Sequence, residues 1–508
     1  MLDSDSVSVV QDELNGRRLQ VASGKGTGGG SSINACMWVR GGGRLFDSWV
    51  EAGATGWDSR TMEDLFVDME AGRFGAKPMT IQPAAKGNWA AEAFVQACVD
   101  TGTVGETGDY NARFQPDHGI AAITNQNVTE DGRRCDAFST FVGATPADRP
   151  ANLVVLTNAT VHRIVIDAES KEATGVVVNV QGSGAQFLRA RREVVLSAGA
   201  LDSPKLLMLS GVGPREELEK HGIEVVHEVL GVGASFQDHA LCNVSVFVDR
   251  EVGDRSGSGL NATAFYRSSY AAEHEPNEPL DMQLVGIPGL PITHVLPYLV
   301  LDRFVRLPSA TCSDKTTVQG QLYRFALSTI MWAVNAFSLD NKWMGPIRKM
   351  YAIGVVCNRP TQRGRIRLAS RDPEARPVID FQWLGVPDQM DRMVEGVKKA
   401  IAVLEKAFVV TNWGLVGYDQ LRTGGDEAIR AFLRTTATHA WHPAGSLRMG
   451  AASDETAVCD PQGRVRGVGN LRVADASLMP VVTNGNTNAS SMVIGYKVAQ
   501  HMAEELGA

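Results

Sequence analysis

Two residues in the last quarter of the chain have side chains suited to accepting a proton and to holding the oxygen that loses it. His442 opens the segment HPAGSLRMG, and Asn486 lies in NGNTNAS. Imidazole has an ordinary pKa of about 6.5, so His442 can accept a proton near neutral pH, and Pro443 to Gly445 would restrict its approach. The Asn486 amide can donate a hydrogen bond to a substrate oxygen but cannot act as a base. The two residue types together are suited to general-base catalysis with a hydrogen-bond donor at a second position.

The same residues also have structural interpretations. His442 is one of ten histidines in the chain, and His439 or any other histidine can equally be a hydrogen-bonded core residue. The NGNTN segment that contains Asn486 is typical of a plain turn. The glycine-dense residues 24–32 are, by themselves, typical of a loop. The residue types alone leave both interpretations open.

The element that most clearly positions such a site is a strand, a turn and a helix that lead into GALDSPKLLMLSGVG at residues 199–213. Val194 to Leu196 form a short apolar run, which is typical of a strand covered on both faces. Gly199 then lets the chain turn sharply. The pattern predicts a buried strand that feeds a helix.

The helix after this turn has its own start and stop signals. Asp202 or Ser203 can cap it, and Pro204 suits its first turn. Gly211 can end it in a left-handed conformation. We therefore predict a short helix between these signals.

Other segments give the remaining organisation. Residues 153–196 have a β-like pattern, LVVL, VHRIVI, GVVVNV and EVVLSAG, with a turn at 169–172, and this predicts a meander. Residues 50–118 and 241–435 are more irregular and richer in Pro and Trp. Residues 489–505 have the apolar spacing of a final helix.

Composition and charge exclude several classes of protein. The chain has 508 residues, 44% of them hydrophobic and 21% charged, which is ordinary for a globular protein of two or more domains. Its 49 basic and 57 acidic residues give a net charge of -8. Because no basic run could follow a phosphate backbone, we expect no nucleic-acid partner.

The cysteines and the apolar stretches narrow the class further. The seven cysteines form no C-x-x-C pair, so we expect neither a disulfide framework nor a metal site. The acidic start has no apolar signal region. The longest uncharged stretch, Phe325 to Leu339, falls short of the ~20 residues that a membrane-spanning helix needs. We predict a soluble, cytoplasmic protein with no membrane span.

Five segments together resemble the glucose-methanol-choline (GMC) family of flavin oxidoreductases. One departure is Thr27, where the family usually has an aliphatic residue. The resemblance spans nearly the whole chain. The matching segments are GKGTGGGSSINACMWVRGGGRLFD at 24–47, residues 199–213, GVGASFQDH at 231–239, HPAGSLRMG at 442–450, and DASLMP with NGNTNAS near the end.

The resemblance implies a mixed α/β fold with two interleaved domains. An FAD-binding domain would comprise residues 1–49, 119–240 and 436–508. A substrate-binding cap domain with an antiparallel sheet would comprise residues 50–118 and 241–435. The implied cofactor is FAD, and the implied partners are a small-molecule alcohol and oxygen or another electron acceptor.

The resemblance also implies which residues contact the cofactor. The positive end of the final helix, at residues 487–489, would stabilise negative charge on the reduced flavin. Ile33 stands where some relatives carry a histidine that binds flavin covalently, so we expect non-covalent FAD. The predicted cofactor-binding residues are Gly28, Gly29, Ser31, Asn34, Val161, Asp475, Ala476, Thr487 and Asn488.

The implied reaction is oxidation of a CH-OH group by hydride transfer to flavin N5. His442 would be the base, and Asn486 would hold the substrate oxygen. Two alternatives remain open from the sequence. The chain could be a non-redox lyase or cyclase on the same scaffold, or an inactive, flavin-poor fragment.

The start of the chain departs from the family pattern. The family has a dinucleotide-binding βαβ unit, with a G-x-G-x-x-G turn, ahead of the first matching segment. Only 23 residues precede Gly24, and they contain no such turn. The pattern can be forced onto Gly24, Gly26 and Gly29 with Asp47 as the ribose acid, but SSINACMW is not typical of a capped helix. We therefore expect the unit to be missing.

Overall fold

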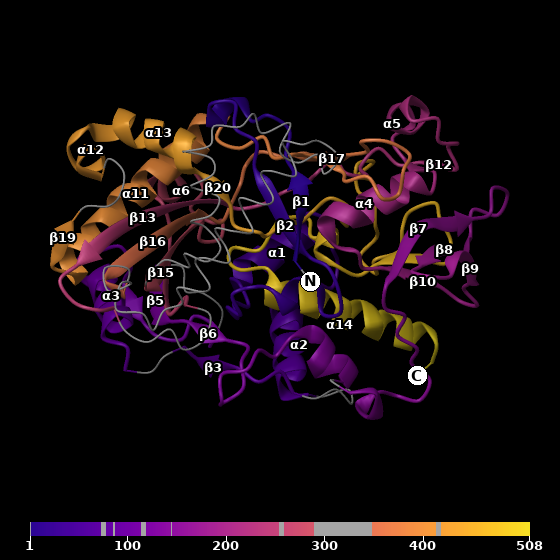
Figure 1. The fold of residues 1–508 in the computed structure, drawn as a ribbon, viewed down its shortest axis with the longest axis horizontal. Helices are drawn as coiled ribbons and strands as arrows, with labels where there is room; N and C mark the ends of the chain where they lie inside the picture. Colours follow the sequence, from indigo (N-terminus) through magenta and orange to yellow (C-terminus); the bar gives the residue numbers. More distant parts are fainter. Residues whose placement is uncertain are drawn as a thin grey trace.

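The computed structural model describes residues 2–72, 78–84, 87–112, 118–143, 145–252, 259–288, 348–412 and 418–507. Two groups of elements lie at opposite ends of the long axis of the molecule (Figure 1). One is built on a large, mainly antiparallel sheet, and the other on several small sheets around a helix. The predicted mixed α/β fold is confirmed.

The large sheet consists mostly of residues predicted for the cap domain, and we call it the cap sheet. Among the described residues it has eight strands in the order β19-β13-β16-β15-β14-β5-β4, with β20 also beside β13. Every pair is antiparallel except β4 with β5. The strands are β4 (Glu106–Thr107), β5 (Ile120–Ile123), β13 (Ala240–Val248), β14 (Ala262–Tyr266), β15 (Met282–Pro288), β16 (Met350–Cys357), β19 (Val410–Asn412) and β20 (Thr438–His439).

Two long helices, α3 (Trp89–Asp100) and α11 (Pro387–Ala407), cover one face of this sheet (Figure 1). The side chains of β13 alternate between buried and half-buried, as period-2 geometry requires. Gly396 of α11 permits the close approach, because a Cβ there would lie 2.4 Å from Cγ1 of Val355. The opposite face of the sheet is therefore the one that meets the rest of the molecule.

The smaller group contains the predicted meander and the turn after it. Strands β7 (Ala159–Ile166), β8 (Ala173–Val180) and β9 (Gly184–Arg189) form an antiparallel sheet. β10 (Val194–Leu196) instead pairs in parallel with β21 (Leu471–Val473). The chain then turns at Gly199, where φ is +83°, into α4 (Gly199–Leu209).

Several local expectations about this region are wrong. The LVVL run at residues 153–156 lies in no strand, and Val154 is 79% exposed. β9 was missed because all of its side chains are exposed and carry no burial pattern. β10 is not covered on both faces, since Val195 is 41% exposed.

The predicted helix begins earlier than its cap signals suggest. α4 starts at Gly199, so Pro204 lies inside it, and Ser203 Oγ donates to Asp475 instead of capping the helix. Gly211 follows the helix with φ +81°, which confirms the predicted left-handed end. The tertiary contact with Asp475 moves the start of the helix, and the local glycine signal fixes its end.

The start of the chain is a hairpin. β1 (Leu2–Val7) pairs antiparallel with β2 (Gln20–Gly24), and a short 3-10 turn at Gly29–Ser32 follows. A strand, glycine turn and α-helix are thus not found between residues 2 and 32. A 3-10 turn, and not an α-helix, thus follows Gly24, Gly26 and Gly29, and the absence of the dinucleotide-binding unit stays a prediction.

The remaining helices pack around these sheets. Figure 1 shows α14 and α1 between the two groups, with α2 beside α14. The helices are α1 (Gly43–Glu51), α2 (Ser59–Ala71), α5 (Arg215–Lys220), α6 (Ser269–His274), α12 (Tyr418–Thr423), α13 (Gly425–Thr436) and α14 (Asn488–Glu505). The remaining short strands are β3 (Gln82–Pro83), β6 (Asn125–Gln126), β11 (Val212–Gly213), β12 (His227–Glu228), β17 (Arg365–Arg367) and β18 (Val378–Asp380).

Some expectations stay untested. The described helices include none long and apolar enough to cross a membrane, and residues 325–339 lie outside the described part. The cytoplasmic location stays a prediction. So do the domain boundaries, although β5 belongs to the cap sheet while its residues fall in the range predicted for the FAD-binding domain.

Candidate active site

The structure brings His442 and Asn486 together. β20 pairs with the start of β13, and the chain then turns at Trp441, where φ is +59°, to present His442. Asn486 lies just before Thr487, which occupies the N-cap position of α14. The distance between His442 Nε2 and Asn486 Nδ2 is 3.2 Å. A base and an amide donor thus face the same point from two segments.

A second histidine contacts His442 from behind. The Nδ1 atoms of His239 and His442 are 2.8 Å apart, and their rings cross at 80°. The backbone N–H of His442 donates to Asp238 Oδ1 at 2.9 Å. Sequence reasoning missed both His239 and Asp238, although they end the GVGASFQDH segment that carries part of the family resemblance.

Burial keeps this cluster uncharged. It lowers the pKa of His442 to about 3, with a smaller effect from nearby His439. It lowers the pKa of His439 to about 4 and that of His239 well below its ordinary value. Burial also raises the pKa of Asp238 to about 8, against the N–H groups that bond to it. His442 is therefore neutral near pH 7, with a lone pair on one ring nitrogen.

The cap sheet contributes a buried amide to the same site. Gln283 of β15 is 1% exposed, and its Nε2 donates to Asn486 Oδ1 at 3.4 Å. The same Nε2 donates to Thr263 Oγ1 at 3.0 Å. Sequence reasoning missed Gln283, because a single glutamine in an apolar strand gives no local signal.

The glycine-dense loop is held in shape by one arginine. Gly28 and Gly29 have φ of +81° and +53°, and a Cβ at Gly29 would meet nothing within 4 Å. Ser31 Oγ donates to the Gly28 carbonyl at 2.6 Å. Arg134, which sequence reasoning missed, donates to the Ser31 carbonyl at 2.9 Å and to the Asn34 carbonyl at 2.6 Å. The loop therefore has open space beside Gly29 but not beside Gly28, where a Cβ would lie 2.2 Å from Ser32 Oγ.

The other predicted residues divide into two groups. Asp475 accepts from Gly199 N at 2.9 Å and from Ser203 Oγ at 2.6 Å, so it ties the turn before α4 to the segment after β21. The Ala476 carbonyl accepts from Gly445 N at 3.0 Å, which links this corner to the His442 segment. Val161 lies apart on β7, where it pairs with β8 and is 37% exposed.

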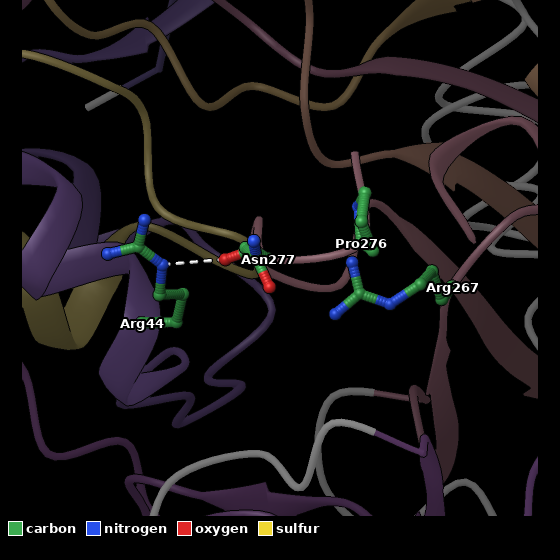
Figure 2. Close-up of a pocket in the computed structure, with 4 residues that line it drawn as sticks. All are labelled: Arg44, Arg267, Pro276 and Asn277. Atoms are coloured by element: carbon green, nitrogen blue, oxygen red, sulfur yellow. Dashed lines mark hydrogen bonds between the residues drawn. The ribbon is translucent and has the colours of Figure 1, made fainter. Parts of the chain in front are cut away.

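A separate cavity of about 540 Å³ lies beside α1 (Figure 2). Arg44, Arg267, Pro276 and Asn277 line it, and Arg44 Nε donates to the Asn277 carbonyl at 2.6 Å. None of the residues predicted from the sequence lines this cavity. It is therefore distinct from the His442 and Asn486 pair.

Two family models match the chain. The model described as GMC oxidoreductase for the N-terminal part matches residues 6–241, and its C-terminal counterpart matches residues 360–495. The chain belongs to the GMC oxidoreductase family. It is an FAD-dependent enzyme that oxidises an alcohol group, and these findings give no support to a non-redox activity.

Curated relatives share about a third of the sequence. An oxygen-dependent choline dehydrogenase of Sinorhizobium medicae is 32% identical over 505 residues, which is 98% of this chain and 84% of that protein. The same named enzyme of Brucella anthropi is 31% identical over 499 residues, 97% of this chain and 84% of that protein.

Solved structures share the fold at lower identity. Formate oxidase superposes with a TM-score of 0.77 and 21% identity, covering 98% of this chain and 87% of that chain. Pyridoxine 4-oxidase from Mesorbium loti superposes with a TM-score of 0.75 and 21% identity, covering 98% of this chain and 88% of that chain. The cap sheet and the flavin-side elements thus have the family arrangement.

The start of α14 has features that suit the ring of a flavin. The side chain of Thr487 does not cap α14, and the first backbone N–H groups of a helix have no partner within the helix. They offer positive charge directly after Asn486. Gly29 and Gly199 have open space where a Cβ would stand. These donors and openings suit a planar group with carbonyl oxygens.

Proposed function

We propose that His442 is the general base that removes the hydroxyl proton of the alcohol, and that Asn486 holds the alcohol oxygen. The observation that carries this proposal is the 3.2 Å distance between His442 Nε2 and Asn486 Nδ2. FAD, when bound, accepts the hydride from the alcohol carbon. The protein groups then have to orient the O–H bond and receive its proton.

The low pKa of His442 keeps the ring unprotonated, although a base of lower pKa also accepts a proton less readily. Because the ring is neutral near pH 7, its lone pair is available without a preceding deprotonation step. The proton is transferred from the alcohol oxygen to His442 Nε2, while the Asn486 N–H group stabilises the negative charge that develops on the oxygen. Each residue acts at a different atom of the same O–H group.

Apolar packing supports exclusion of water around the reacting oxygen. A Cβ on Gly485 would lie 2.6 Å from Val39 Cγ1 and 3.4 Å from Phe265, so these side chains close over the backbone beside Asn486. In a dry site a hydrogen bond to a charged oxygen is stronger than in water.

We propose that the substrate is an uncharged primary alcohol. The cap-sheet row around Gln283 consists of cross-strand neighbours from four other strands, and they are apolar. None of these four residues is a carboxylate that could pair with a cationic alcohol such as choline, and Glu106, which extends the row beyond Ile120, is exposed and lies 3.3 Å from His118. The neighbours are Ile120, Phe265, Val356 and Leu241.

Anaerobic addition of alcohol to the FAD-loaded protein tests the proposal. We expect benzyl alcohol to bleach the oxidised flavin faster than choline does, and we expect His442→Ala to abolish rapid bleaching. His118→Ala, at a histidine whose side chain is 60% exposed, is the matched control and should bleach as the wild type does. Faster bleaching by choline would overturn the substrate class, and bleaching by no alcohol would overturn the function.

A further inference from the structure

A continuous series of hydrogen bonds crosses the active site from the cap sheet. It begins at a backbone carbonyl, that of Leu284, which accepts from Thr263 Oγ1 at 3.1 Å. Gln283 Nε2 lies 3.0 Å from the same Thr263 oxygen and 3.4 Å from Asn486 Oδ1. We name this series, continued below through the two histidines, the site chain.

The site chain continues through two histidines. Asn486 Nδ2 is 3.2 Å from His442 Nε2. His442 Nδ1 is 2.8 Å from His239 Nδ1. The site chain therefore links His442 to its neighbours Asn486 and His239 without a gap.

The direction of each bond follows from the first one. A carbonyl oxygen only accepts, so the single hydrogen of the Thr263 hydroxyl is committed to the Leu284 carbonyl. Thr263 Oγ1 must then accept, and the end of Gln283 that faces it must be the NH2 group. The same NH2 group has its second hydrogen for Asn486, which must present its oxygen to Gln283.

The orientation of Asn486 then determines which ring nitrogen of His442 carries the proton. With its oxygen toward Gln283, the Asn486 amide presents its NH2 group to His442 Nε2. That nitrogen must therefore carry a lone pair, and the proton of the neutral ring must sit on Nδ1. The Nδ1–H group donates to His239 Nδ1, whose ring keeps its own proton on Nε2.

We propose that Gln283 is a positioning residue, which through the site chain holds His442 as the tautomer with its proton on Nδ1 and its lone pair on Nε2. In the folded chain this lone pair accepts from Asn486, and it receives the alcohol proton once the O–H group takes that place. The catalytic meaning rests on the function proposed above, whereas the tautomer is a property of the folded chain alone.

The place of Gln283 in the fold makes it able to do this. It lies in the middle of the cap sheet, paired with Phe265 on β14 and with Val356 on β16. Gln283 is 1% exposed and Thr263 is 0% exposed. A buried amide between two paired strands cannot exchange its ends freely, because its oxygen would then face the Thr263 lone pairs.

Other polar groups around His442 are compatible with this tautomer. Asp238 accepts from the backbone of His442, not from its ring. His439 bonds through Nε2 to the Gln20 carbonyl, 2.8 Å away, so its proton is committed elsewhere. The backbone carbonyls of Thr483 and Asn358 act on the His239 ring and favour a proton there, although Nε2 of that ring has no hydrogen bond of normal geometry among the described residues.

Nitrogen-15 NMR of histidine-labelled protein tests the tautomer directly, because a ring nitrogen with a lone pair and one with a proton have well-separated shifts. We expect His442, assigned by its loss in His442→Gln, to carry its proton on Nδ1 in the wild type. Gln283→Met should shift the ring toward the other tautomer. A wild-type ring protonated on Nε2, or a ring unaffected by Gln283→Met, overturns the proposal.

Matched variants guard against a misfolded mutant. Thr263→Val removes the hydroxyl that orients Gln283 and should move the tautomer in the same direction, while Thr263→Ser should restore the wild-type pattern. Asn243→Leu removes another amide from the same sheet face, one whose Oδ1 has no hydrogen bond among the described residues. It should leave the tautomer unchanged, and a change as large as that of Gln283→Met would overturn the specific role.

The rate of flavin reduction by benzyl alcohol supplies the catalytic readout. We expect Gln283→Met to lower the limiting rate about tenfold or more, with a smaller change in the alcohol concentration at half-saturation. If the wild type is not reduced by any alcohol, the proposed function fails, but the NMR result still tests the tautomer. An unchanged limiting rate in Gln283→Met would remove the positioning role.

Discussion

Two buried polar regions flank the cap sheet, one beside α11 and one beside the active site, and they are built differently. On the α11 side, Arg392, with a fully buried side chain, pairs with Asp281 at 2.9 Å and with Glu275 at 2.8 Å. On the active-site side, the site chain from Thr263 to His239 contains no formal charge. The difference indicates that ion pairs hold the cap elements together. The site chain instead orients His442 through the direction of neutral hydrogen bonds.

The physical reason lies in what each region must keep constant. A buried ion pair holds two elements at one distance, but a charge beside His442 would change the proton affinity of the base. Neutral amides can hold a donor and a lone pair in place without that effect. Substitutions in the two regions should therefore separate stability from turnover.

The largest effect on stability should follow Arg392→Met. Removing one partner leaves Asp281 buried and unpaired, which costs about 3–5 kcal/mol. Denaturant unfolding should show this loss, while the limiting rate of flavin reduction per folded, FAD-loaded molecule should stay near that of the wild type. A large fall in that rate with unchanged stability would erase the distinction between the two regions.

Substitution of Asn486 should instead lower the rate of flavin reduction and leave stability near that of the wild type. Asn486→Asp places a carboxylate against the developing alkoxide and the reduced flavin, so flavin reduction should slow by about 10²–10³-fold. Asn486→His, which keeps a donor, should be less impaired. Equal rates in the two variants would mean that Asn486 does not contact the reacting oxygen.

The uncharged histidines predict how stability depends on pH. His239, His439 and His442 have folded-state pKa values below their ordinary value because they are buried. The unfolded chain binds protons below about pH 6.5 that the folded chain resists until about pH 3–4, so stability is lost as the pH falls through this window.

Asp238 has the opposite sign, since its raised pKa removes stability as the pH rises toward about 8. Thermal unfolding at pH 5 and pH 7 measures the balance. We expect a lower melting temperature at pH 5, and a smaller difference in His439→Gln, which removes one of the buried rings. A wild-type melting temperature that is the same at both values would contradict the neutral cluster.

The smallest effect should come from a surface pair. Arg133 and Asp131 form an ion pair in which the arginine side chain is 82% exposed. Such pairs contribute about 0–1 kcal/mol. Arg133→Gln should change neither unfolding nor flavin reduction measurably, and it therefore sets the baseline for the larger effects.

The sequence predicted the features that rest on local chemistry. The turn at Gly199 and the helix end at Gly211 need positive φ, which glycine alone adopts without cost, so the residue type was sufficient. The antiparallel cap sheet and the family followed from several separated motifs. Adjacency of His442 and Asn486 came from those motifs and not from their own spacing.

The features that the sequence could not predict depend on contacts across the fold. β9 has only exposed side chains, and α4 begins where Asp475, 276 positions away, binds Gly199. Gln283 and His239 reach the site by strand pairing and by the approach of two distant loops. The roles of these two side chains depend on whether their partners donate or accept, and this leaves no pattern in the sequence.

The most direct test of the account is single-turnover reduction of bound FAD by benzyl alcohol in His442→Ala. We predict that the rate falls by about two to four orders of magnitude, as expected for loss of a general base, while flavin content matches that of the wild type. A near-normal rate in the flavin-loaded variant would contradict the assignment of His442 as the base, and with it the role of the chain of hydrogen bonds that orients it.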